Sequence, residues 1–188
     1  MIITTEGYEL VFRHRERSKN IPLKETFYYI FFTTSGEKYV VLYEYYMNDV
    51  FAVKFFPRSF RKSHYKYNKL TNSHDAIKVL KTIGKAIPSL LQEFPHASFS
   101  FCGARLIDIR DPNSFIEPLD QNQRFRIFSA MVQSLIGFET FYHVQIKDYS
   151  SYLLLNKQMS EYAASIKAQN IIKMFCDHFA EFPDYTQL

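Results

Sequence analysis

The sequence predicts an α+β domain in which an antiparallel sheet packs against amphipathic helices. The chain holds 19 Phe and 14 Tyr with no Trp, and these rings favour the pleated, half-buried surface of a sheet. Its first third consists of aromatic and β-branched segments without a helical period, separated by short polar turns. Its later part contains three segments in which apolar residues recur at three- and four-residue steps, as in amphipathic helices.

Four strands are expected in the first third, over residues 8–14, 26–34, 38–47 and 51–56. The first alternates apolar and polar residues, and the others are dense in Phe, Tyr, Val and Ile. A polar loop is expected from Arg13 to Asn20. Short polar turns separate the later strands, which predicts an antiparallel meander.

The clearest helix in the sequence is expected from Ser73 to Phe94. Ser73 is a suitable N-cap, and Asp75 falls in the first turn, where a negative charge is favoured. Pro88 has no N–H to bond back to the carbonyl of Gly84, so the helix should bend or weaken there.

The rest of the chain predicts two or three further strands and two more amphipathic helices. In order, these are a strand at 98–102, a loop at 104–118 in which 106–109 is a candidate short strand, a helix at 121–136 ending at Gly137, strands at 140–146 and 151–155, and a helix at 159–182. No repeat, low-complexity tract or linker divides them. A single domain over residues 1–188 is therefore expected.

Net charge and hydropathy limit the classes of partner. The 23 Lys and Arg against 19 Asp and Glu give a charge of +4, a smaller excess than a protein that coats nucleic acid carries. No run of about 18 apolar residues is present, and the N-terminus does not resemble a signal peptide. Cys102 and Cys176 are too few for a disulfide framework. The expected protein is cytoplasmic, has reduced thiols and binds no membrane.

Standard catalytic signatures are missing from the sequence. It contains no glycine-rich phosphate loop, dinucleotide fingerprint, paired-cysteine zinc spacing or nucleophile elbow. The histidines are scattered. No catalytic residue, metal site or cofactor is predicted, and a non-enzymatic role is favoured.

The best functional candidate is the basic loop, residues 58–69. Between Arg58 and Lys69 the chain has five Lys or Arg and no carboxylate. The candidate binding residues in it are Arg58, Arg61, Lys62, His64, Lys66 and Lys69, interleaved with Phe60, Tyr65 and Tyr67. Lys and Arg neutralise phosphates, and exposed rings stack on unpaired bases. The alternative is a solvated loop whose aromatic side chains belong to the core.

Arg124 and Arg126 are further candidates at the start of the second helix. Two residues apart on a helix, they face different sides. One is expected to pack its aliphatic stem along the sheet while the other reaches solvent, and either could hold a phosphate or carboxylate with two hydrogen bonds.

Three segments carry a resemblance to known proteins. They are Tyr67-Asn68-Lys69-Leu70-Thr71-Asn72-Ser73 before the long helix, Phe94-Pro95-His96-Ala97-Ser98-Phe99-Ser100-Phe101-Cys102-Gly103, and Arg124-Phe125-Arg126-Ile127-Phe128. Over about residues 27 to 136 the chain resembles small uncharacterised α+β proteins of bacteria and their mobile elements. The resemblance implies an α+β domain of bacterial or phage source and implies no activity.

Three functions remain open from the sequence. The leading one is a binding module that engages nucleic acid or an acidic protein partner through the basic loop. The second is a protein–protein or self-assembly component, such as a homo-oligomer or one half of a bacterial defence or toxin–antitoxin pair. The third is a metal-dependent nuclease, in which Asp108 and Asp111 would hold Mg²⁺ with help from Glu117 and Asp120.

Overall fold

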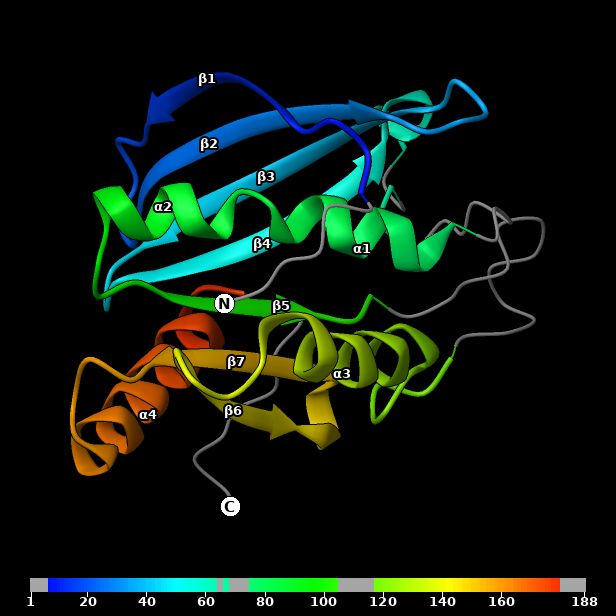
Figure 1. The fold of residues 1–188 in the computed structure, drawn as a ribbon. Helices are drawn as coiled ribbons and strands as arrows, with labels where there is room; N and C mark the ends of the chain where they lie inside the picture. Colours follow the sequence, from blue (N-terminus) through cyan, green and yellow to red (C-terminus); the bar gives the residue numbers. More distant parts are fainter. Residues whose placement is uncertain (1–6, 64–65, 68–74, 105–116, 180–188) are drawn as a thin grey trace.

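The described residues form a seven-stranded mixed sheet with helices on both faces (Figure 1). The computed structural model describes residues 7–63, 66–67, 75–104 and 117–179. The strand order is β1-β2-β3-β4-β5-β7-β6. This arrangement confirms the predicted α+β class.

The predicted meander is confirmed. It comprises β1 (Val11–Arg17), β2 (Leu23–Phe32), β3 (Lys38–Tyr46) and β4 (Val50–Pro57), each antiparallel to the next. The tight turns use residues that tolerate positive φ: Gly36 at 82°, Asn48 at 64° and Asp49 at 48°. Local turn chemistry therefore fixes the order of these strands.

The prediction of a polar loop from Arg13 onward was wrong, because β1 continues to Arg17. All seven residues of β1 are exposed, and the strand pairs with β2 alone at the edge of the sheet. An edge strand tolerates charged side chains, which also discourage pairing with another chain. The charges that suggested a loop therefore belong to a solvated edge.

The predicted long helix is divided into α1 (Ala76–Gly84) and α2 (Ile87–Glu93). Pro88 lies in the first turn of α2, where the missing N–H costs least. The expected interruption near Gly84 is thus confirmed. The expected N-cap, Ser73, lies outside the described residues.

The second half of the chain follows the predicted order. It comprises β5 (Ser98–Cys102), α3 (Gln123–Ile136), β6 (Phe141–Ile146), β7 (Ser151–Asn156) and α4 (Glu161–His178), with a short 3₁₀ turn, η2 (Lys147–Tyr149), between β6 and β7. β5 is parallel to β4 and antiparallel to β7. Gly137 ends α3 with a φ of 66°. The short strand expected at 106–109 lies outside the described residues.

Each face of the sheet has its own apolar core. On one face, α1, α2 and α3 cover the fully buried rings of β2–β5, among them Phe31 and Phe51, and Figure 1 shows these three helices on the same side. On the other face, α4 packs Ala168 and Ile171 against Val50 and β7. Side chains that alternate along β2, β3 and β4 therefore point to different layers.

Candidate polyanion-binding surface

The basic loop begins directly after β4 with a 3₁₀ turn, η1 (Arg58–Phe60). The N–H of Arg61 donates to the Arg58 carbonyl at 3.1 Å, and that of Ser63 donates to the Phe60 carbonyl at 2.8 Å. These backbone bonds close the turn, while the side chains of Arg58, Arg61 and Lys62 are exposed. Two further candidates, His64 and Lys69, lie outside the described residues.

None of these three exposed cations forms an ion pair with a described residue. The carboxylate that contacts η1 is Glu37, whose Oε1 accepts a hydrogen bond from Ser59 at 3.0 Å. The side chains of Arg58, Arg61 and Lys62 therefore lie at the surface, without a carboxylate partner among the described residues.

Lys66 and Tyr67 of the basic loop pack onto the sheet. Lys66 Nζ lies 4.8 Å from the ring centroid of Phe56 and 4.9 Å from that of Tyr67, and the two rings meet edge to face at 5.5 Å. Burial is the main cause that raises the pKa of Tyr67 to about 12. The Tyr67 ring is thus packed against the sheet. This agrees with the alternative interpretation, in which the loop is solvated and its aromatic rings belong to the core.

Two other segments add cations beside η1. Desolvation, together with the positive charges of Arg58 and Arg13, lowers the pKa of Lys38. Arg13 is exposed at a register shift in β1. Lys38 opens β3, whose next residue pairs with the last residue of β4. Antiparallel pairing therefore brings the start of β3 to the start of η1.

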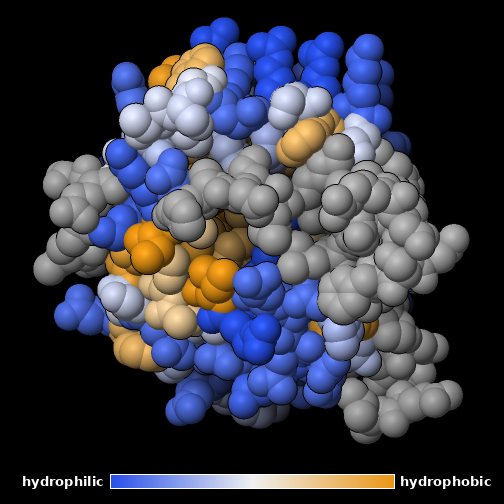
Figure 2. Space-filling model, turned by 90° about the vertical axis from the view of Figure 1, so that its right-hand side faces the viewer, coloured by the Kyte–Doolittle hydropathy of each residue, from blue (hydrophilic) through white to orange (hydrophobic). Residues whose placement is uncertain are grey.

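An exposed aromatic ring accompanies these cations. Phe32 is 56% exposed, pairs with Lys38 in the β2–β3 ladder, and has the Lys38 Nζ 5.6 Å from its ring centroid. We call Arg13, Lys38, Arg58, Arg61, Lys62 and Phe32 the basic surface. Figure 2 shows hydrophilic side chains gathered along the upper border of the molecule, the side on which β1–β3 lie in Figure 1.

Sequence reasoning identified three of these residues and missed Arg13, Lys38 and Phe32. They are distant from the basic loop along the chain, so local charge counting could not include them. The predicted antiparallel meander carried part of the missing signal, because pairing β3 with β4 places the start of β3 beside the end of β4.

The two arginines of α3 have different environments. Arg124 is half-buried, and burial lowers its pKa while Glu117 and Tyr39 oppose the shift. Arg126 is exposed. Tyr39 lies in the core under α1–α3, whereas the alternation of β3 directs Lys38 to the other face. Arg124 is therefore not assigned to the basic surface, and Arg126 stays a separate exposed candidate on α3.

The residues proposed for a nuclease are only partly described. Asp108 and Asp111 lie outside the described residues, and Glu117 accepts a hydrogen bond from the backbone N–H of Gln123 at 2.6 Å. In the part of the chain that the structure describes, no group of three His, Cys, Asp or Glu could hold a metal ion. Cys102 is exposed and Cys176 is partly buried.

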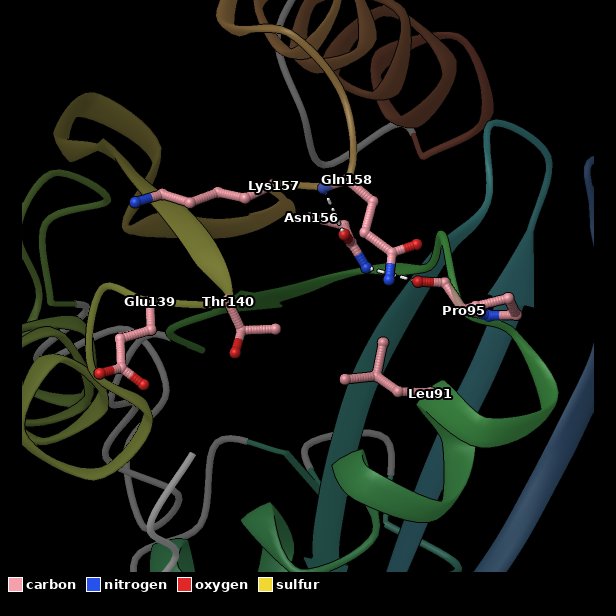
Figure 3. Close-up of a pocket in the computed structure, with 7 residues that line it drawn as sticks. All are labelled: Leu91, Pro95, Glu139, Thr140, Asn156, Lys157 and Gln158. Carbon is pink, nitrogen blue, oxygen red and sulfur yellow. Dashed lines mark hydrogen bonds between the residues drawn. The ribbon is translucent and has the colours of Figure 1, made fainter.

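A shallow pocket lies between α2, the start of β6 and the end of β7 (Figure 3). It is lined by Leu91, Pro95, Glu139, Thr140, Asn156, Lys157 and Gln158. Asn156 Nδ2 donates across it to the Pro95 carbonyl at 2.7 Å, and Lys157 Nζ donates to the Phe138 carbonyl at 2.5 Å. Its central polar groups are thus engaged within the protein.

His143 on β6 is held in one neutral form. Its Nε2 donates to the Gly137 carbonyl at 2.5 Å, so its Nδ1 accepts from the Tyr152 hydroxyl at 2.8 Å. Burial, aided by the charge of Lys157, lowers the pKa of His143 below its ordinary value of 6.5, and the bond to Gly137 opposes the shift. This ring is therefore set to stay uncharged in the folded protein.

We expect the protein to lose stability as the pH falls below about 6.5. The unfolded chain binds the His143 proton more tightly than the folded chain, so folding is disfavoured as the pH drops toward the folded-state pKa. Urea unfolding at neutral and mildly acidic pH should show a smaller acid loss for His143→Asn than for the wild type. His96→Asn, in the exposed turn before β5, is the matched control. Equal acid losses in wild type and His143→Asn would contradict the assignment.

In the described part of the chain, no helix combines the length and apolar character needed to cross a bilayer. No protein-family model, curated protein or solved structure significantly matches the chain.

Proposed function

We propose that the chain is a non-enzymatic binding module that engages a polyanionic partner, nucleic acid or an acidic protein surface, through the basic surface. The observation that supports this proposal is the pairing of β3 with β4, which places Lys38 beside the start of η1, where Arg58 follows β4. The charges of Arg58 and Arg13 both act on Lys38, and none of the three is ion-paired with a described residue.

Because these cations are clustered, the positive potential at the basic surface is stronger than the net charge of +4 suggests. Neighbouring like charges raise the local positive potential, which concentrates an anionic partner and accelerates its association. Their repulsion falls when a polyanion neutralises them, and the counterions released from the polyanion favour the complex. Binding through such a surface must weaken as salt rises.

Replacing Arg58, Arg61 and Lys62 together with alanine should weaken polyanion binding and its dependence on salt. On heparin, a polyanion without bases, the triple variant should elute at lower salt than the wild type. On nucleic acid, each lost phosphate contact should reduce the slope of log K against log salt by about 0.7–0.9. The measurements are heparin elution and a salt titration of binding.

The matched control removes the same charge elsewhere. Lys19, Lys147 and Lys173 are exposed lysines outside the basic surface, and their triple alanine variant should behave like the wild type. Equal elution of the two triple variants would show that net charge alone governs retention. Failure of the wild type to bind heparin or nucleic acid at physiological ionic strength would also refute the proposal.

A further inference from the structure

Phe32 is exposed for a reason that the strand pattern makes plain. Along β2 the residues Phe27, Tyr29 and Phe31 point into the core under the helices and are at most 8% exposed. Phe32 follows Phe31 and so points to the opposite face, at the end of the strand, where it is 56% exposed. The hydrophobic core does not account for this ring.

Several cations surround the exposed ring of Phe32. Lys38 lies opposite it in the ladder and contacts its ring, and Arg58 and Arg13 lie within electrostatic reach of Lys38. An acidic protein surface would engage the cations but offers no regular series of flat rings to Phe32. A nucleic acid strand presents phosphates and flat bases together, and exposed aromatic rings bind bases irrespective of their identity.

Single-stranded and double-stranded nucleic acids differ in whether the faces of their bases are accessible to a protein ring. In a duplex the bases stack on one another and expose only their edges in the grooves. In a single strand their faces are free to stack on a protein ring while the backbone follows a positively charged surface.

We infer that the polyanion is a single-stranded nucleic acid, with a base stacked on Phe32 and the flanking phosphates bound by Lys38, Arg58 and Arg13. This inference rests on the proposed function and names the ligand class of the same surface. It assigns Phe32 to base contact and the cations to backbone contact.

The decisive variant is Phe32→Ala, tested by fluorescence anisotropy with labelled oligothymidylate and by elution from heparin. Loss of one base–ring stack should weaken oligothymidylate binding at least about 5-fold. The salt slope and heparin elution should stay unchanged, because no charge is removed. Phe32→Tyr should retain binding, since tyrosine also stacks. The wild type should prefer oligothymidylate to a duplex of the same length and to polyglutamate.

Phe138→Ala is the matched control, because Phe138 is also 56% exposed but lies beside β6, at the opposite edge of the sheet from β1. It should bind oligothymidylate like the wild type.

If Phe32→Ala leaves oligothymidylate binding intact, or lowers heparin binding equally, base stacking is refuted while polyanion binding stands. Equal or tighter binding of duplex or polyglutamate refutes the single-strand assignment in the same way. A wild-type protein that binds neither heparin nor oligothymidylate refutes the proposed function together with this inference.

Discussion

Replacing Phe51 with alanine is expected to lower the free energy of unfolding by about 3–5 kcal/mol. Phe51 has no exposed surface, and its ring packs against five other described rings, with centroids 4.8 Å away at Tyr45, 5.4 Å at Phe94 and Phe99, 5.8 Å at Phe27 and 6.4 Å at Tyr43. The close-packed rings can collapse only partly into the space that is left, so a cavity adds to the lost transfer free energy.

The position of Phe51 makes this loss consequential for the whole sheet. Phe27 belongs to the meander, Phe94 follows α2, and Phe99 lies opposite Phe51 in the parallel β4–β5 pair. Because domains are stable by only about 5–15 kcal/mol, the loss would remove a large share of the total. For a chain of this size the melting temperature should fall by about 6–20 °C.

Urea unfolding followed by far-ultraviolet circular dichroism and tyrosine fluorescence measures this effect. Phe32→Ala is the matched control, because it removes the same side chain from the same sheet at an exposed site. It should cost about 1 kcal/mol or less. Similar losses in the two variants would contradict both the central place of Phe51 and the exposed placement of Phe32.

The meander could be predicted because its signals are local. Alternation, β-branched residues and turns such as Asn48-Asp49 act over a few neighbours, and the structure follows them through β2, β3 and β4. The break before Pro88 was predictable for the same reason, since the missing N–H is a property of one residue.

The order of β5, β6 and β7 in the sheet could not be predicted from local sequence signals. β7 pairs with both β5 and β6, an arrangement that depends on which apolar faces meet after the helices pack. β5 lies beside β4 and runs parallel to it, a pairing that requires a crossover connection such as the one through α1 and α2.

The candidate site shows the same division between local and distant signals. The charges of Arg58, Arg61 and Lys62 are evident from a short segment of sequence, but their exposure is not. Lys38 and Phe32 reach this surface through the register of the β2–β3 hairpin, and a shift of one residue would have turned both toward the core.

Replacing Asn156 with alanine is expected to lower the free energy of unfolding by about 1.5–4.5 kcal/mol, from three hydrogen bonds of about 0.5–1.5 kcal/mol each. Asn156 is 2% exposed at the end of β7. Its Nδ2 donates to the Pro95 carbonyl at 2.7 Å, and its Oδ1 accepts from the Gln158 N–H at 2.9 Å (Figure 3). Its Nδ2 also donates to the Ala97 carbonyl at 3.2 Å. One side chain thus joins the α2–β5 turn to the β7–α4 turn, and alanine would leave all three backbone groups without this partner.

Asn156→Asp separates the donor role of this side chain from its shape. Aspartate keeps the acceptor for Gln158 but directs a carboxylate at the carbonyls of Pro95 and Ala97, so at neutral pH it should destabilise the fold more than alanine does. Burial beside two carbonyls should raise the folded-state pKa of the introduced carboxyl group above the unfolded value of about 3.9. Protonation then restores an O–H donor, so the deficit relative to wild type should be smallest at acid pH and grow as the pH rises through that pKa. Urea unfolding of both variants at several pH values measures this. A pH-independent deficit in Asn156→Asp would show that the two carbonyls do not depend on the Asn156 amide.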